Sequence, residues 1–270
     1  MISSTDYAFF RTFLYARSGL ALSDDKHYLL ESRLMPVARQ IGASSLAQLV
    51  DRLKQPHEDR TRKAVVEAMT TNESLFFRDK QPFDAFISVV LPTLHAARPA
   101  GRELRIWSAA ASTGQEPYSL AMLLQEHAAK IPGRRVEIIS TDISGEALER
   151  ARSGLYTQFE VQRGLPVRYL LKHFAKEGDN WRISQDIRRM VTFREFNLLE
   201  SPVLLGKFDV IFCRNVLIYF DLETKREVLG RLETVLARDG FLVLGGAETV
   251  VGITDRFKPS PAQRALNVRV

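Results

Sequence analysis

The sequence predicts an α/β protein: a Rossmann-like domain with a doubly wound sheet, preceded by a small all-α N-terminal domain and carrying a small antiparallel β-subdomain insertion. Two observations indicate this fold class. In residues 1–70 apolar side chains recur at helical spacing. From residue 83 onward, short apolar strand patterns alternate with helical patterns, as expected for a mostly parallel sheet covered by helices. The expected domains are therefore 1–70 and 83–270, joined by a linker at 71–82.

The composition is that of an ordinary globular protein. Of 270 residues, 45% are hydrophobic and 26% are charged, and the net charge is +6. The basic residues are spread along the chain, so no polybasic arm for nucleic acid or membrane binding is indicated. Apolar stretches stay well below the roughly 20 residues that a membrane helix requires, so no membrane insertion is expected.

The single cysteine and the scattered histidines exclude several kinds of site. Cys213 lies in the apolar run 208–213, which predicts an inert core thiol. Because it is the one cysteine of the sequence, an intrachain disulfide is excluded. The five histidines lack ligand spacing, so no metal is expected. Asp6 and Arg11 interrupt the apolar pattern at the N-terminus, which argues against a signal peptide and favours a cytoplasmic protein.

The N-terminal domain reads as a bundle of helices beginning at Ser4. Pro36 is expected to kink or restart the second helix, and Gly42 to end it. Ser45 is a candidate N-cap for the next helix, and a last helix is expected over 58–69.

The linker contains the unusual stretch 70–79, TTNESLFFRD. It sets polar side chains around the apolar pair Phe76 and Phe77, whereas an ordinary linker contains few aromatic residues. We expect it to pack against the protein and to lend polar groups to a site. A helix over 83–94 then leads into the central strand.

The central βαβ unit begins with a buried strand at 104–107. Small residues at 108–112 and Gly114 follow, and Pro117 with an acidic neighbour opens a helix over 118–130. This order allows a flat ligand to approach the backbone at the start of the helix.

Asp142 closes the next predicted strand, 136–143, where a carboxylate can accept hydrogen bonds from both hydroxyls of a ribose. The glycine-rich fingerprint of pyrophosphate binding is absent, which favours a ligand without phosphates, such as S-adenosylmethionine. The alternative is that Asp142 is the N-cap of the helix starting near Ser144.

The rest of the chain continues the alternation. A helix at 144–152 precedes an irregular segment at 154–165, and the β-subdomain is expected over about 160–190 with a strand at 181–187. The remaining expected elements are strands at 191–196, 208–215 and 241–248, a helix at 222–237, a break at 239–240, and an edge strand at 265–270.

In such a sheet the ligand lies beyond the carboxyl ends of the strands. Besides the stretch 109–116 and Asp142, these ends carry Asn197 and Leu198 after one strand, and Asn215, Val216 and Tyr219 after another.

At this point the sequence resembles a known family, the CheR-type chemotaxis receptor methyltransferases. The blocks TTNESLFFRD, AAASTGQEPYSLAMLL, ISTDIS, NLLES and FDVIFCRNVLIYF stand in family order, and the likeness covers essentially the whole chain. It implies a protein-glutamate O-methyltransferase that uses S-adenosylmethionine, yields S-adenosylhomocysteine, and esterifies glutamate side chains of chemoreceptor cytoplasmic domains in chemotactic adaptation. By matching position, the cofactor contacts would be Asn72, Ser74, Arg78, Glu116, Asp142, Asn197, Leu198, Asn215 and Val216.

The segment 175–184 looks shorter than in family members that dock on a receptor's C-terminal pentapeptide, so the chain resembles the pentapeptide-independent type. Arg78 is the candidate to hold a carboxylate, either that of the acceptor or that of the cofactor's methionine. Tyr219 could line the methyl's path, or be an ordinary aromatic at the sheet edge. Lys26, Arg33 and Arg39 are candidates for docking on an acidic receptor.

Three other functions stay open on the residues alone. One is a nucleic-acid methyltransferase, although the sequence lacks the two prolines expected after Asn215 in such an enzyme. Another is a non-catalytic adaptor, which would bind the cofactor without turnover. The third is a nicotinamide oxidoreductase, although the sequence lacks its glycine fingerprint. We expect no nucleic-acid partner and a monomer.

Overall fold

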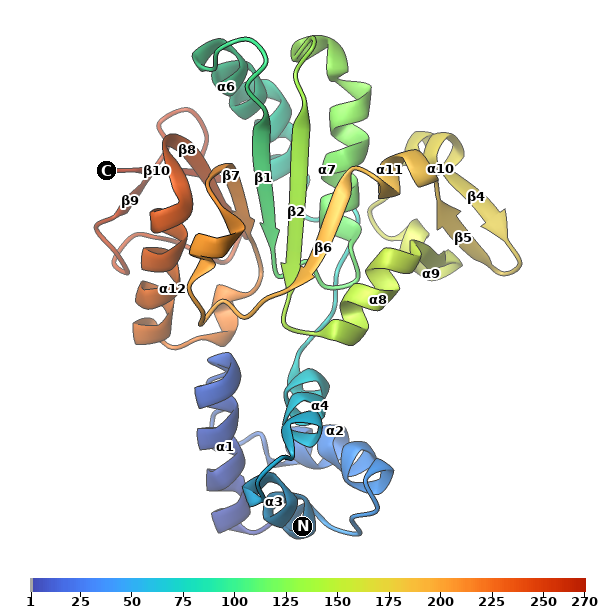
Figure 1. Ribbon diagram of the computed structural model, residues 1–270, viewed down its shortest axis with the longest axis vertical. Coiled ribbons are helices and arrows are strands. Elements are labelled where there is room, and N and C mark those ends of the chain that lie inside the picture. Colours follow the sequence, from blue (N-terminus) through green and yellow to red (C-terminus); the bar gives the residue numbers. More distant parts are fainter. Residues whose placement is uncertain (1) are drawn as a thin grey trace. The chain divides into compact units, whose positions relative to one another are not determined.

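The computed structural model describes residues 2–270 (Figure 1). The chain forms two compact units. One is the segment up to Thr71 together with Tyr219–Thr224, and the other is Asn72–Ile218 together with Lys225–Val270. The division expected from the sequence, at residues 70 and 83, stays a prediction. Among the described residues, no helix is both long and apolar enough to cross a membrane.

The first unit is helical, as predicted. Ser3 and Ser45 cap helices by accepting the backbone N–H of Asp6 and Gln48. Buried side chains at helical spacing, such as Phe10 and Leu14, form its core. The helices are α1 (Ser4–Ser18), α2 (His27–Gln40), α3 (Leu46–Lys54) and α4 (Asp59–Met69).

The predicted restart of the helix at Pro36 is wrong, because α2 continues through it to Gln40, and the alternative of a kink stays a prediction. A proline removes the hydrogen bond to the carbonyl four residues earlier, here that of Ser32. Pro36 and Ser32 are both exposed, so water can hydrate this carbonyl at low cost.

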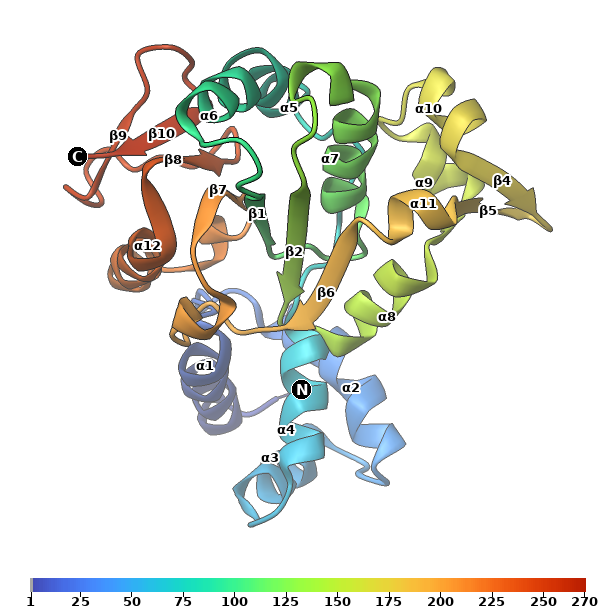
Figure 2. The ribbon, with the colours of Figure 1, turned by 45° about the horizontal axis from the view of Figure 1, so that its top comes forward.

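The second unit is built on a seven-stranded sheet (Figure 2). The spatial order is β6-β2-β1-β7-β8-β10-β9, in which the first five strands are parallel and β10 is antiparallel to both of its neighbours. The strands are β1 (Leu104–Ala109), β2 (Val136–Asp142), β6 (Val191–Glu195), β7 (Phe208–Cys213), β8 (Leu236–Leu244), β9 (Phe257–Pro259) and β10 (Leu266–Arg269).

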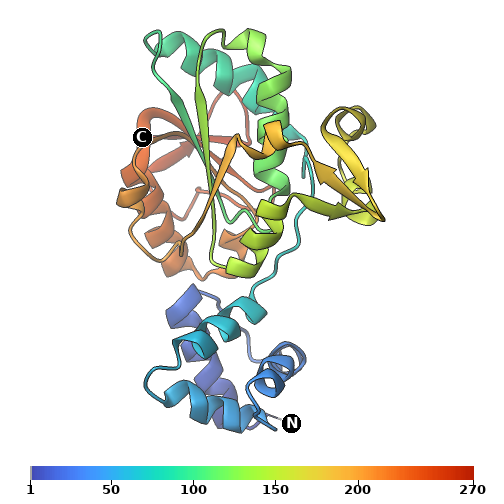
Figure 3. The ribbon, with the colours of Figure 1, turned by 45° about the vertical axis from the view of Figure 1, so that its right-hand side comes forward.

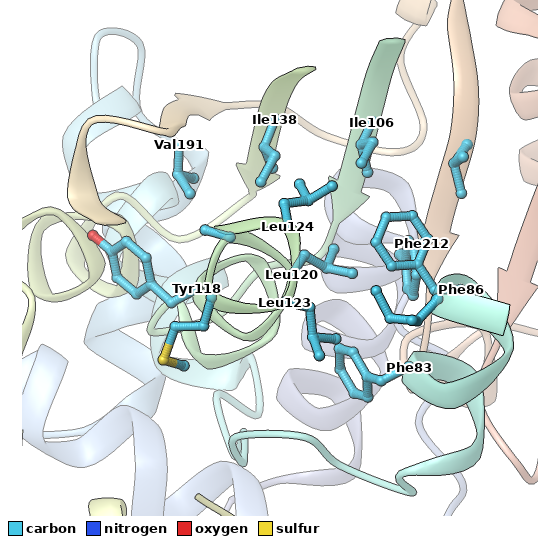
Figure 4. Close-up of a cluster of buried hydrophobic side chains, with 14 of the residues drawn as sticks. Phe83, Phe86, Ile106, Tyr118, Leu120, Leu123, Leu124, Ile138, Val191 and Phe212 are labelled. Atoms are coloured by element: carbon cyan, nitrogen blue, oxygen red, sulfur yellow. The ribbon is translucent and has the colours of Figure 1, made fainter. Parts of the chain in front are cut away.

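Helix α7 (Gln115–Glu126) packs on this sheet through its apolar face. Leu120 and Leu124 lie toward strand residues such as Ile106 and Ile138, and Leu123 lies beside Phe83 (Figure 4). Beside them lies a continuous helical run made of α5 (Gln81–Ala85), the π-helical η1 (Phe86–Val90) and α6 (Leu91–Ala97). Helix α8 (Gly145–Ser153) follows β2, and helix α12 (Leu222–Val235) precedes β8.

Two details of the sheet correct the sequence expectations. The break expected at 239–240 lies inside β8 as an irregularity, because the pairing shifts from Phe208 with Leu236 to Val210 with Phe241. Gly240 fits there because an added Cβ would lie 2.8 Å from the Asp209 carbonyl oxygen. The strand expected at the edge, β10, is covered by β9, which forms the edge instead.

The inserted subdomain contains a three-stranded antiparallel sheet in the order β3-β5-β4, set apart from the large sheet (Figure 3). The segment 154–165 is not irregular as expected, because Thr157 and Glu160 form a capping box that starts a helix. The strand expected at 181–187 stops at Ile183, where Ser184 begins a helical turn. The elements are β3 (Leu155–Thr157), α9 (Gln158–Gln162), α10 (Val167–His173), β4 (Phe174–Glu177), β5 (Asn180–Ile183) and α11 (Gln185–Arg188).

Candidate active site at the carboxyl edge of the sheet

The loop after β1 has an uncommon backbone. Ala110 and Ser112 have φ of 62° and 51°, a left-handed conformation that costs energy in residues with a side chain. Gly114, with φ of 93°, leads into α7, and a Cβ there would lie 2.9 Å from the Ala151 Cβ. Such a backbone persists only where neighbouring groups hold it.

Asp142, at the end of β2, holds this loop. Its buried carboxylate accepts the backbone N–H of Ser112 at 2.7 Å and that of Ser144 at 2.9 Å. The N-cap of α8 is Ser144, whose hydroxyl accepts the N–H of Ala147, so the capping alternative for Asp142 is wrong.

A buried arginine that the sequence reasoning missed lies directly after β7. The Arg214 guanidinium donates to the Glu116 carboxylate and to the Asp79 carboxylate, each at 2.9 Å, and to the Arg78 carbonyl at 2.8 Å. The other oxygen of Glu116 accepts the Ser108 hydroxyl at 2.8 Å. Arg214 thus links the residues before α5 to the first turn of α7.

The linker brings its predicted site residues to the same edge. The Asn72 carbonyl accepts the Ser112 hydroxyl at 2.7 Å. The Arg78 side chain makes one long hydrogen bond, 3.5 Å, to the Glu73 carbonyl. Ser74 is half-buried, and its hydroxyl makes no hydrogen bond to any other residue in the range 2–270.

After β6, Asn197 turns the chain by accepting the backbone N–H of Leu199 on its side-chain oxygen at 3.0 Å. Leu198 is buried. The backbone N–H of Phe196 donates to the Asp142 carbonyl at 3.0 Å, which keeps this strand end beside β2.

A second residue that the sequence reasoning missed, the carboxylate of Glu248, lies beyond the end of β8. It accepts four backbone N–H groups, from Gly245 and Asn215 at 2.8 Å, from Val216 at 3.0 Å and from Ile218 at 3.3 Å. Asn215 has φ of 58°, so Glu248 holds a left-handed residue in the loop after β7.

The remaining predicted residues lie in the helical unit. Tyr219 is half-buried, and its carbonyl accepts the backbone N–H of Ala21 at 3.0 Å. Lys26 is paired with Asp25 at 2.9 Å. The Arg33 guanidinium donates to the carbonyls at the end of α4, and Arg39 is exposed.

Cys213 is fully buried, and burial raises the pKa of its thiol well above the usual range, as expected of an inert core cysteine. Within residues 2–270, no group of three or more His, Cys, Asp or Glu side chains could hold a metal ion.

Comparison with known proteins decides the family. Residues 5–70 match the all-alpha domain of the CheR methyltransferases, and residues 72–266 match their SAM-binding domain. The chain belongs to the CheR methyltransferase family. The second unit is therefore an S-adenosylmethionine-binding domain, as the sequence predicted.

Similar curated proteins include chemotaxis protein methyltransferases from three bacteria. The chain is 44% identical over 260 residues to methyltransferase 1 of Pseudomonas aeruginosa, which covers 95% of this chain and 94% of that protein. It is 41% identical over 257 residues to Cher2 of Pseudomonas putida, covering 94% and 93%. For the Escherichia coli protein the identity is 36% over 248 residues, covering 90% and 84%.

The charges at the carboxyl edge of this CheR-family sheet fit the family's cofactor. The side chains of Asp79, Glu116, Asp142 and Glu248 bring four carboxylates to loops where Arg214 is the buried cation. Such a set suits a ligand with positive charge, and S-adenosylmethionine carries a sulfonium and an ammonium group. It does not suit a pyrophosphate.

Weak signals for both missed residues were present in the sequence. Arg214 directly follows the mostly apolar strand 208–213, and Glu248 ends the run FLVLGGAE at the end of another predicted strand. Their partners are backbone groups and side chains far away in sequence, so only the fold shows what they bind.

Glu248→Gln should lower the free energy of unfolding by about 1.5 to 3 kcal/mol, the value of a hydrogen bond to a charged group. An amide nitrogen in place of one carboxylate oxygen would face backbone N–H donors instead of accepting from them. Urea unfolding of Glu248→Gln and of the exposed control Glu223→Gln measures the difference. Equal stability of the two variants would show that Glu248 does not hold these loops.

Proposed function

We propose that this methyltransferase acts in chemotaxis and transfers a methyl group from S-adenosylmethionine to glutamate side chains of chemoreceptor cytoplasmic domains, forming methyl esters. The observation that carries the proposal is the similarity to curated chemotaxis protein methyltransferases, which spans 90% or more of the chain. The acidic carboxyl edge of the sheet supports it.

When bound, S-adenosylmethionine supplies an electrophilic methyl group on a sulfonium sulfur. The residues that would hold it lie on loops from four strand ends and on the linker. Asp142 accepts the backbone N–H groups of Ser112 and Ser144, one on each oxygen, and a carboxylate oxygen can accept more than one hydrogen bond, as a ribose hydroxyl would require. The proposed contacts are Asn72, Ser74, Arg78, Glu116, Asp142, Asn197, Leu198, Asn215 and Val216.

The acceptor needs no general base. A glutamate side chain has an unperturbed pKa of about 4.3, so its carboxylate is already a nucleophile at neutral pH. The protein's task is to place and partly desolvate this carboxylate, which can be worth an effective concentration on the order of 10⁵ M.

Arg78 is the arginine suited to hold a carboxylate. The Arg214 guanidinium already serves Glu116 and Asp79, whereas the Arg78 side chain has one weak contact to a carbonyl. Its planar fork can bind a carboxylate with two parallel hydrogen bonds. Tyr219 follows the loop that Glu248 holds and would line the path of the methyl group.

The receptor would dock on basic residues of α2 and the loop before it. A substitution of Arg33 would not test docking alone. Its guanidinium donates to the carbonyls of Met69 and Thr70 at 2.9 Å and so satisfies the end of α4. Removing Arg33 would disturb the helical unit itself. Arg39 is exposed and, across residues 2–270, makes no side-chain hydrogen bond or ion pair, so it can meet an acidic partner.

We further propose that the enzyme is pentapeptide-independent, cytoplasmic and monomeric and has no nucleic-acid partner. The first point is supported by the hairpin between β4 and β5, where Glu177 pairs with Asn180 and only Gly178 and Asp179 form the turn. This turn leaves no extended loop for a peptide.

The proposed activity is tested by transfer of a tritiated methyl group from S-adenosylmethionine to a purified chemoreceptor cytoplasmic domain. We expect label on the receptor that mild alkali releases as volatile methanol, because a glutamate methyl ester is base-labile. Label that is stable to alkali would contradict ester formation and favour N- or C-methylation. Cofactor binding without any label on a panel of receptors would favour the non-catalytic adaptor.

Asp142→Asn should weaken S-adenosylmethionine binding by about 1.5 to 3 kcal/mol, because the ribose hydroxyls lose a charged acceptor. Isothermal calorimetry on the folded variant measures this loss. The exposed substitution Asp186→Asn in α11 makes the same chemical change away from the loops and should leave the affinity unchanged. An unaltered affinity of Asp142→Asn would limit Asp142 to holding Ser112 and Ser144.

Arg39→Glu should raise the KM for receptor several-fold without changing cofactor affinity, since it reverses a charge that faces an acidic partner. The control is Lys258→Glu, an equal charge change on the exposed edge strand β9. Steady-state methylation at two salt concentrations measures both, and the difference should shrink at high salt. A receptor KM equal to that of the control would remove Arg39 from the docking surface.

A further inference from the structure

The inserted subdomain packs directly on the linker segment 72–79, which carries three of the proposed cofactor contacts. Phe76, fully buried, inserts its ring between two aromatic residues of the subdomain. Its centroid lies 5.0 Å from that of Tyr156 in β3 and 5.6 Å from that of Phe174 in β4, both edge to face. The linker therefore supplies part of the subdomain's core.

Phe77 is held by the subdomain as well. Its ring stacks on Tyr169 of α10 at 4.9 Å, and its backbone N–H donates to the Ser119 hydroxyl at 3.0 Å. Phe77 has φ of 52°, a strained conformation that these contacts maintain. Tyr169 is itself anchored: burial and a hydrogen bond with Glu126 of α7 raise its pKa to about 12.

The closest approach is at Gly164, between α9 and α10. A Cβ at this position would lie 2.1 Å from the carbonyl oxygen of Phe76, so no other residue fits without moving the linker backbone. The neighbouring Arg163 pairs with Glu73 of the linker at 2.9 Å. The subdomain thus contacts the linker at Glu73, Phe76 and Phe77.

The two ends of the same segment are bonded to the site. The Asn72 carbonyl accepts the Ser112 hydroxyl, and the Arg78 carbonyl accepts Arg214. The subdomain contacts lie between these two bonds. Because both ends of this short segment are fixed, it cannot follow a shift of Phe76 by moving as a whole. The shift would instead change the backbone conformation two residues away on either side, at Ser74 and Arg78.

We propose that the inserted subdomain is a positioning element of the cofactor site: through Gly164, Tyr169 and the pocket for Phe76 it sets the linker conformation that presents Asn72, Ser74 and Arg78. This role is additional to any contact of the subdomain with a receptor. It rests on the proposed function, in which these linker residues bind S-adenosylmethionine. The residues Gly164 and Tyr169 are positioning residues and touch no reacting atom.

The test compares two glycines of the subdomain that both have a left-handed backbone. Gly164 has φ of 87° and abuts Phe76, whereas Gly178 has φ of 60° in the β4–β5 turn with no atom within 4 Å of an added Cβ. Gly164→Ala and Gly178→Ala carry similar backbone strain, but only the first displaces the linker. Calorimetric titration of the full chain with S-adenosylhomocysteine is the readout.

Gly164→Ala should raise the dissociation constant about tenfold or more, since displacement of a binding group by about 1 Å suffices for such a loss. Gly178→Ala should leave it within about twofold of the unaltered chain. Equal dissociation constants for the two variants would overturn the inference while leaving the proposed function intact. Failure of the unaltered chain to bind S-adenosylhomocysteine would instead overturn the proposed function, and this inference with it.

A second pair keeps the test decisive if Gly164→Ala does not fold. Tyr169→Phe keeps the ring that stacks on Phe77, and Tyr169→Leu removes it. We expect weakened S-adenosylhomocysteine binding for Tyr169→Leu and near-normal binding for Tyr169→Phe, at equal receptor KM. Loss of receptor affinity with unchanged cofactor affinity in Tyr169→Leu would contradict the inference, because it would confine the subdomain to receptor contact.

Discussion

The site depends on two carboxylates, Asp142 and Glu248, that accept backbone N–H groups. Loops at the carboxyl ends of parallel strands must turn sharply, and here Ala110 and Ser112 take left-handed conformations that alanine and serine do not favour, as does Asn215, a residue type that adopts this conformation more readily. Asp142 holds the first of these loops and Glu248 the last. Hydrogen bonds from backbone donors to a carboxylate are about twice as strong as neutral ones, so two acidic side chains can offset the strain.

The same acidic groups give the edge its chemical character. Arg214 neutralises Glu116 and Asp79, while Asp142 and Glu248 accept backbone N–H groups. The edge therefore suits a cationic, phosphate-free ligand. The protein need not supply a general base, because a glutamate acceptor is already ionised at neutral pH. Catalysis then consists mainly of holding two partners in line, which explains why so much of the structure serves to fix backbone.

The sequence predicted the parts of the fold that depend on local pattern. The parallel strands, the helical N-terminal unit, the cap at Ser45 and the position of Asp142 follow from apolar spacing and turn residues. It failed where tertiary contacts decide. Exposure makes Pro36 harmless, pairing with β7 draws residues 239–240 into β8, and β9 covers the expected edge strand. Arg214 and Glu248 were missed because their partners are distant in sequence. Glu248 lies 33 residues from Asn215, and Arg214 lies 98 residues from Glu116, so both meet their partners only in the folded sheet.

These loops are already held before the cofactor binds. Amide hydrogen exchange of the cofactor-free protein tests this most directly, at Ser112, Asn215 and Val216, with the exposed Gly246 as an unprotected reference. We expect the three amides to exchange much more slowly than that of Gly246 in the free protein and to change little when S-adenosylmethionine is added. Exchange as fast as that of Gly246, with protection gained only on cofactor binding, would contradict it and show that the cofactor, not the carboxylates, orders the site.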